Sequence, residues 1–203
     1  MAKKEDRLLR VGVLGAGQIA QAAHFESCTK ARNAELFAIC DVADDLRERM
    51  SVTHGARKTF ADYDKMLADP ELDAVIIATS DAFHVPASLR ALAAGKHVLC
   101  EKPLGLTVEE VEELARAVKA SGKVLQVGHM KRFDPGLEAA KQFIDGEMGD
   151  LVALKAWYCD STHRYAMTDA VQPLVVASKN AKNPPGIPRR TFVAITCSPM
   201  AAI

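Results

Sequence analysis

The residues best suited to chemistry near the start of the sequence form a glycine-rich turn, Gly15-x-Gly17-x-x-Ala20. This turn follows an apolar run typical of a strand and opens a run typical of a helix, which is the context a dinucleotide-binding turn needs. Gly15 allows the tight turn, Gly17 lets the backbone approach a pyrophosphate, and Ala20 lets the helix pack closely on the sheet. The free N–H groups at the helix start, around Gln18 and Ile19, would then face the phosphates. A tight turn without a ligand is the structural alternative.

An acidic residue, Asp41, ends the next predicted strand about 25 residues further on. A carboxylate at this place accepts hydrogen bonds from the ribose hydroxyls of NAD and repels the 2′-phosphate of NADP. Val42 follows it, where an arginine would have suggested phosphate recognition. The sequence therefore predicts NAD as the cofactor, in preference to NADP. The alternative is that Asp41 only caps the helix expected from Ala43.

Short apolar runs alternate with amphipathic stretches along most of the chain, which predicts an α/β fold with a doubly wound parallel Rossmann sheet. Strands are expected at 8–14, 35–40, 57–60, 73–78, 97–100 and 124–127, and helices at 18–30, 43–52, 63–67, 86–94, 107–122 and 135–144. A capping box at Thr107 and Glu110 is expected to start the fifth of these helices.

A change of pattern near residue 149 predicts a domain boundary. Apolar and polar residues partly alternate over 151–158, which indicates a strand of a different kind. We expect a dinucleotide-binding domain at 1–148, the beginning of a truncated α+β substrate domain at 149–185, and a separate tail at 186–203.

Composition excludes several classes of function. The formal net charge is zero, so the sequence predicts no nucleic-acid or membrane-surface partner. No apolar run is long enough for a membrane span, and no signal peptide is expected. The five cysteines are scattered and lack a Cys-x-x-Cys pair, which favours a reducing cytoplasm over a disulfide framework or a metal site.

Three further segments follow later predicted strands, at the sheet edge where open α/β folds bind ligands. They are Thr79-Ser-Asp-Ala-Phe-His84, Glu101-Lys-Pro103 and Gly128-His-Met-Lys-Arg-Phe-Asp-Pro135. With the glycine turn, and with the string Gly95-Lys-His-Val-Leu-Cys-Glu-Lys-Pro103, they make the chain resemble the Gfo/Idh/MocA family of NAD(P)-dependent sugar and polyol oxidoreductases. The resemblance covers residues 10–185. Ser80 stands where the family commonly has proline, and this difference loosens a loop without removing a catalytic group.

The resemblance implies roles for residues on the cofactor side. Lys102 matches the family lysine beside nicotinamide and the reacting hydroxyl, where an ammonium polarises that oxygen and assists its proton loss. Glu101 would orient Lys102 or contact the cofactor, and Pro103 would fix the turn through a cis bond. Thr79 and His84 would belong to the cofactor-side loop, with an ordinary helix-entry histidine as the alternative for His84.

The resemblance also implies candidates on the substrate side. Arg132 would hold the substrate or the domain seam, with a surface ion pair as the alternative. The segment Asp160-Ser-Thr-His-Arg-Tyr165 resembles one that leaves the first substrate-domain strand in some relatives, so His163 and Arg164 are substrate candidates. The implied reaction is hydride transfer between nicotinamide and a secondary alcohol of a sugar, inositol or related polyol.

The end of the sequence departs from the family. Family members continue with a mostly antiparallel sheet, through which they often self-associate and which carries a later Asp/His pair; this chain ends before it. A one-base deletion in a family-like reading frame would yield Gly186-Ile-Pro-Arg-Arg-Thr-Phe192, so we interpret 186–203 as a frameshift-like tail and expect it to be disordered. Sequencing of the gene tests this hypothesis. The alternative function is a catalytically incomplete NAD-binding fragment or a non-catalytic dinucleotide-binding module. A third interpretation, a redox-sensing regulator, is not supported, because the sequence shows no separate helix-turn-helix region and no basic patch.

Overall fold

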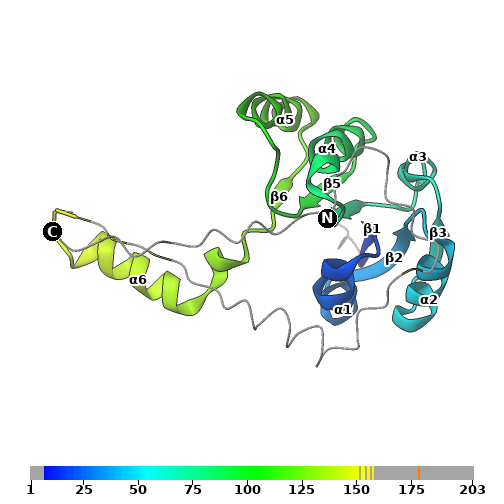
Figure 1. Ribbon diagram of the computed structural model, residues 1–203, viewed down its shortest axis with the longest axis horizontal. Coiled ribbons are helices and arrows are strands. Elements are labelled where there is room, and N and C mark those ends of the chain that lie inside the picture. The colour runs from blue at the N-terminus through cyan, green and yellow to red at the C-terminus, as the bar shows by residue number, and fades with distance from the viewer. Residues whose placement is uncertain (1–6, 151, 154, 156, 158–177, 179–203) are drawn as a thin grey trace, which may run out of the picture.

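A computed structural model describes residues 7–150 together with 152, 153, 155, 157 and 178. One sheet of six parallel strands runs through the middle of the molecule in the order β3-β2-β1-β4-β5-β6 (Figure 1). The strands are β1 (Leu9–Leu14), β2 (Ala34–Cys40), β3 (Lys58–Phe60), β4 (Ala74–Ile77), β5 (His97–Cys100) and β6 (Leu125–Val127). This order is that of a dinucleotide-binding Rossmann sheet, so the predicted fold is confirmed for the described residues.

Helices connect successive strands and lie on both faces of the sheet. The α-helices are α1 (Phe25–Lys30), α2 (Asp44–His54), α3 (Tyr63–Leu67), α4 (His84–Ala93), α5 (Val108–Ser121) and α6 (Pro135–Gly146). Three shorter helical turns are the π-helix η1 (Ala20–His24) and the 3-10 helices η2 (Asp81–Phe83) and η3 (Met130–Phe133). The capping box predicted for α5 is present, with the Thr107 side chain accepting from the Glu110 N–H.

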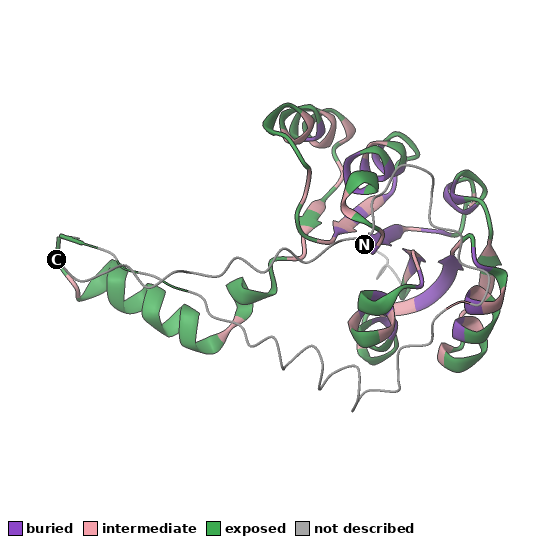
Figure 2. Cartoon of the chain, viewed as in Figure 1, coloured by how far each residue is buried: buried purple, intermediate pink, exposed green. Residues whose placement is uncertain are grey.

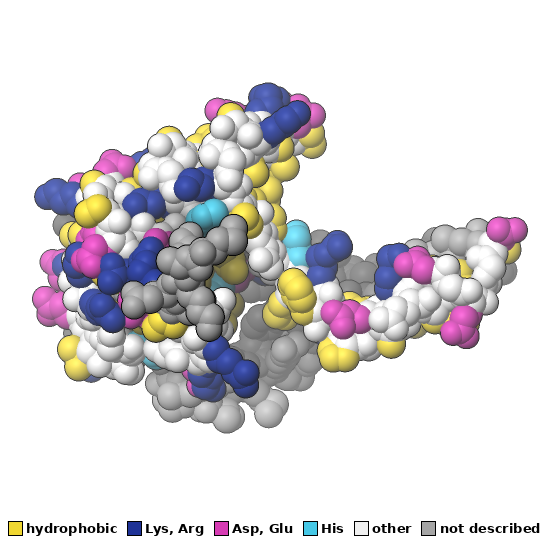
Figure 3. Space-filling view, turned by 180° about the vertical axis from the view of Figure 1, so that it is seen from behind, with side chains coloured by type: hydrophobic (Ala, Val, Ile, Leu, Met, Phe, Trp, Pro, Cys, Tyr) yellow, Lys and Arg dark blue, Asp and Glu magenta, His cyan; other side chains and the backbone are white. Residues whose placement is uncertain are grey.

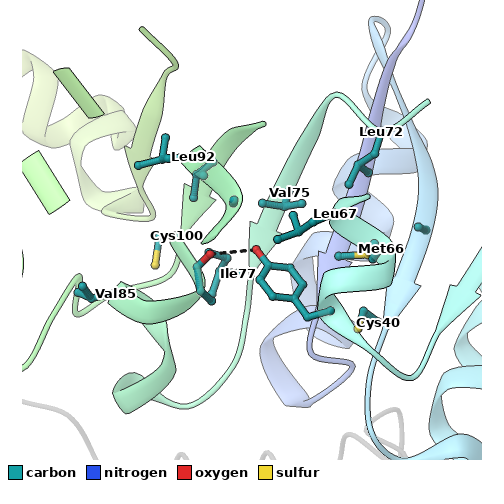
Figure 4. Packing of buried hydrophobic residues seen from close by; sticks show 14 of the residues in the cluster. Cys40, Met66, Leu67, Leu72, Val75, Ile77, Val85, Leu92 and Cys100 are labelled. Atoms are coloured by element: carbon teal, nitrogen blue, oxygen red, sulfur yellow. Dashed lines mark hydrogen bonds between the residues drawn. The ribbon is translucent and has the colours of Figure 1, made fainter. Parts of the chain in front are cut away.

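Two hydrophobic clusters form the core, one on each face of the sheet. Alternate strand residues point to opposite faces, and β4 shows this directly, because Val75 and Ile77 belong to one cluster and Ile76 to the other. The first cluster packs under α3, α4 and α5, and there the Tyr63 hydroxyl donates to the Ala87 carbonyl at 3.1 Å, the dashed bond in Figure 4. The second packs under α1 and α2.

The structure differs from the sequence prediction mainly where helices begin. The single helix expected at 18–30 is divided, because η1 precedes α1 and the Phe25 N–H donates to the Ala20 carbonyl, five residues back. Helix α4 begins at His84 rather than at Pro86. Proline is compatible with a first helical turn, where its missing N–H has no intrahelical partner, so Pro86 did not mark the true start.

Several predictions concern residues outside the described part of the chain. They are the strand at 151–158, most of the domain at 149–185 and the disordered tail at 186–203, and they stay predictions. Within the described residues, no helix combines the length and the apolar character that a membrane crossing requires.

Candidate functional site

The glycine turn joins the end of β1 to the helical turn that follows it. Gly15 has a φ of +94°, and a Cβ there would lie 2.7 Å from the Ala78 carbonyl oxygen of the neighbouring strand end. Only glycine fits this backbone without displacing the main chain. At Gly17, by contrast, a Cβ would have no atom within 4 Å, so the chain leaves open space in front of the helix start. That space, faced by the first N–H groups of a helix, fits a phosphate group.

Asp41 lies at the end of β2, directly beside the glycine turn. Its Oδ2 accepts the Ala16 N–H at 2.7 Å, and its Oδ1 accepts the Ala43 N–H at 2.8 Å. The carboxylate therefore links the glycine turn to the start of α2, and it does more than the capping alternative requires. Each carboxylate oxygen keeps a second lone pair, so the group can still accept hydrogen bonds from a ribose. Arg47 donates to the Asp41 carbonyl at 2.7 Å and fixes the same turn.

His84 connects the ends of two neighbouring strands. Its imidazole is about 1% exposed, with Nε2 at 3.2 Å from the Thr79 carbonyl oxygen and Nδ1 at 2.6 Å from the Pro103 carbonyl oxygen. These contacts leave the ring little surface for a ligand and favour a loop-positioning role. A direct cofactor contact from His84, and one from the half-buried Thr79, stay predictions.

The segment Glu101-Lys-Pro103 follows β5. The predicted cis bond is present between Lys102 and Pro103. The Lys102 side chain is exposed, and within the described part of the chain its ammonium has no hydrogen bond or ion pair. The Glu101 Oε2 accepts the Lys102 N–H at 3.2 Å, which fixes the backbone from which the lysine projects. Both expectations for Glu101, orienting Lys102 and contacting the cofactor, stay predictions.

The end of β6 completes this edge of the sheet. The Gly128 N–H donates to the Cys100 carbonyl at 2.8 Å, and a Cβ on Gly128 would lie 3.3 Å from Glu101 Oε1. Arg132 lies further along on η3 with an exposed side chain, and its role stays a prediction. His163 and Arg164 lie outside the described residues.

Two cysteines end strands at this edge but are unsuited to nucleophilic chemistry. Burial raises the pKa of the Cys100 thiol to about 11. Burial, with the neighbouring Asp41 carboxylate, raises the pKa of the Cys40 thiol to about 12. Both thiols are therefore protonated near neutral pH, and thiolate catalysis is disfavoured.

Sequence reasoning missed one residue of the site, His24. Its Nε2 lies 3.0 Å from Glu101 Oε1, although 77 positions separate the two residues. A histidine inside a helix following a glycine turn carries no local signal for such a contact. Only the parallel order of β1, β4 and β5 brings the two segments together.

The arrangement as a whole defines a class of protein. An open glycine turn, a helix start and a fixed acidic residue converge at the carboxyl ends of parallel strands, where the strand order reverses between β1 and β4. This is the construction of a dinucleotide-binding Rossmann domain.

Comparison with known proteins identifies the family. The family model GFO_IDH_MocA, described as an oxidoreductase family with an NAD-binding Rossmann fold, matches residues 9–129. The chain belongs to this oxidoreductase family.

Similar proteins include named inositol dehydrogenases. Inositol 2-dehydrogenase/D-chiro-inositol 3-dehydrogenase of Shouchella clausii is 37% identical over 142 residues, covering 69% of this chain and 41% of that protein. The scyllo-inositol 2-dehydrogenase (NAD(+)) of Bacillus subtilis is 35% identical over 153 residues, covering 75% and 45%. A crystal structure of scyllo-inositol dehydrogenase from Lactobacillus casei, with bound NAD(H) and scyllo-inositol, has a TM-score of 0.67 at 32% identity, covering 71% and 43%. The chain thus spans less than half the length of these relatives.

Proposed function

We propose that this chain binds NAD in preference to NADP and supplies the cofactor-binding part of a dehydrogenase that acts on a secondary alcohol of a polyol. The observation that carries the proposal is the open glycine turn with the Asp41 carboxylate fixed beside it. The ribose end of the cofactor would meet a negative charge, which a 2′-phosphate would have to approach at an electrostatic cost.

The proposed residue roles follow the order of the strand ends. The N–H groups around Gly17, Gln18 and Ile19 would hold the pyrophosphate, and Asp41 would accept from the ribose hydroxyls. Bound nicotinamide would supply the hydride acceptor or donor. Lys102 would donate a hydrogen bond to the reacting oxygen and stabilise the negative charge that develops there as the hydroxyl proton passes to water.

The proposed substrate class is an inositol, a sugar or a related polyol. It is supported by the names of similar proteins, among them two inositol 2-dehydrogenases and a structure holding scyllo-inositol. A reducing cytoplasm as the site of action is supported by three described cysteines, Cys28, Cys40 and Cys100, which are buried and unpaired. Self-association stays a prediction.

A second candidate function is an NAD-binding module that does not complete hydride transfer by itself. It is favoured by the exposure of Lys102 and of the whole of α6. Hydride transfer requires substrate held within about 3.5 Å of nicotinamide, which an open site does not ensure.

Cofactor titration tests the first proposal. We expect the chain to bind NADH at least about tenfold more tightly than NADPH, measured by calorimetry or fluorescence. Asp41→Ser is expected to remove that preference, because the negative charge is lost. Tighter binding of NADPH by the unmodified chain would contradict the role given to Asp41.

Turnover separates the two candidate functions. Reduction of NAD by the purified chain with myo-inositol or scyllo-inositol, lost in Lys102→Ala, supports the dehydrogenase. NADH binding without turnover supports the binding module. Lys119→Ala on α5 is a matched control, because that lysine is exposed and lies away from the strand ends.

A further inference from the structure

The Glu101 carboxylate is contacted by its own segment and by two other parts of the chain. His24 reaches Oε1 from η1, the Lys102 N–H reaches Oε2, and Gly128 leaves room for Oε1 by lacking a side chain. The side chains of His24 and Glu101 are only 11% and 13% exposed. A carboxylate can only accept, so the His24 Nε2 carries the proton and donates.

His24 occupies an unusual place in the backbone. It ends the five-residue π-helix η1, which interrupts the helix that opens at the glycine turn. Single π-turns within helices occur frequently at functional sites. His24 also lies on the same short segment as the turn expected to hold the pyrophosphate, so one segment reaches both the glycine turn and the Glu101-Lys102 pair.

We infer that His24 is a positioning residue, which holds the Glu101 carboxylate away from the Lys102 ammonium. The two residues are adjacent in sequence, and a carboxylate without another partner attracts a nearby ammonium. In the structure Glu101 Oε1 faces His24 and Oε2 accepts the Lys102 N–H, and within the described part of the chain no ion pair joins the Glu101 carboxylate to the Lys102 ammonium. The arrangement keeps the ammonium free to meet the cofactor and the reacting oxygen. This inference rests on the proposed function of Lys102.

The test uses the whole chain and a readout that does not depend on cofactor. Lys102 is acylated with a brief pulse of acetic anhydride at a fixed, mildly alkaline pH, and its modification is quantified by mass spectrometry with Lys119 as the internal standard. His24→Leu removes the hydrogen-bond donor and replaces the imidazole with an apolar side chain of similar length. We expect it to slow acylation of Lys102 about fivefold, as one opposite charge at contact distance would do in water.

A conservative variant separates positioning from packing. In His24→Gln the side-chain amide can donate the same hydrogen bond, so acylation is expected to return to within about twofold of the original rate. His54→Leu is the matched control, because the His54 ring packs on Phe25 of α1, at 5.0 Å between ring centroids, and has no part in the Glu101 contact. Thermal unfolding of each variant reports its folding.

NADH titration gives the second readout. His24→Leu is expected to weaken NADH binding about tenfold, the scale of one hydrogen bond to a charged group, and His24→Gln to restore it. The inference is overturned if Lys102 is acylated at equal rates in His24→Leu and in the original chain. It is also overturned if acylation of Lys102 is as slow in His24→Gln as in His24→Leu. Slower acylation with unchanged NADH affinity overturns the link to the cofactor. If the original chain does not bind NADH, the proposed function fails, and the acylation rates still decide whether His24 controls Glu101.

Discussion

The two ends of the sheet differ in how completely the rest of the chain covers them. Strands β2, β1 and β4 lie between helices on both faces, and most of their residues are buried. Strands β5 and β6 are only partly covered, since burial alternates along β5 and no residue of β6 is buried (Figure 2). Helix α6, which follows β6, has no buried residue and extends away from the sheet.

The candidate site residues are divided between the same two ends of the sheet. The glycine turn and Asp41 lie at the ends of the covered strands, whereas Lys102 and Arg132 follow the partly covered ones. Viewed from the opposite side, α6 carries hydrophobic side chains at its surface beside charged ones (Figure 3). A dinucleotide site can be completed by one sheet and its helices, and a site for a second, reacting molecule needs a wall on its other side.

The largest expected effect compares equivalent substitutions in the two regions. Phe37 on β2 is 1% exposed, and Phe143 on α6 is 52% exposed. Phe37→Ala is expected to lower the free energy of unfolding by about 3–5 kcal/mol, because it leaves a cavity in the core. Phe143→Ala is expected to lower it by less than about 1 kcal/mol. Chemical denaturation measures both, and equal losses would refute the comparison.

The two glycines of the cofactor turn are expected to respond differently. Gly15→Ala forces a positive φ on a residue with a Cβ, against the Ala78 carbonyl, and should destabilise the fold by about 2 kcal/mol or more. In Gly17→Ala the added Cβ points into open space, so the thermal unfolding midpoint should stay unchanged. The same Cβ would stand where the pyrophosphate is expected, so the affinity for NADH should fall about tenfold. Unchanged NADH affinity in Gly17→Ala would place the phosphates elsewhere.

Low pH is expected to destabilise the fold near β4 through Asp73, the residue that precedes this strand. Burial alone would raise the pKa of the Asp73 carboxyl, but hydrogen bonds from Arg7 and from the Arg10 N–H, with both guanidinium charges, hold that pKa below its ordinary value. A lowered pKa stabilises the fold above the unfolded value, near pH 4, and this stabilisation is lost as the pH falls through the folded value.

Asp73→Asn should therefore cost about 1–2 kcal/mol at neutral pH, and the difference from the original chain should shrink below about pH 4. Thermal unfolding across pH measures it. Asp145→Asn is the matched control, because its ion pair with Lys141 lies on exposed α6 and its removal should change the midpoint little at any pH. A difference for Asp73→Asn that does not vary with pH would exclude the ionic cause.

The smallest effect on stability is expected on the apolar side of α6. Leu137→Ser and Ile144→Ser alter residues that are 52% and 43% exposed, so each should change the free energy of unfolding by less than about 0.5 kcal/mol. Together they should lower the fluorescence of a dye that binds exposed hydrophobic surface. A large loss of stability would show that α6 is covered in solution.

The local sequence was informative wherever local chemistry decides the structure. The continuous apolar run of β4, the capping box at Thr107 and the positive-φ Gly95 and Gly122 that follow helices each act within a few residues, so their elements were predicted nearly to the residue. The start of α4 and the π-turn η1 were not, because Pro86 is compatible with two helix starts and a π-turn has no compositional signature.

By itself the sequence determined the parallel sheet, the glycine turn and the acidic end of β2, because hydrophobic periodicity and glycine's conformational range are properties of short segments. Only the tertiary structure decided which strand ends meet. It placed Asp41 against Ala16, made His84 a bridge between Thr79 and Pro103, and brought His24 to Glu101. Contacts between residues far apart in sequence depend on strand order, and strand order is fixed by packing the whole sheet rather than by any one segment.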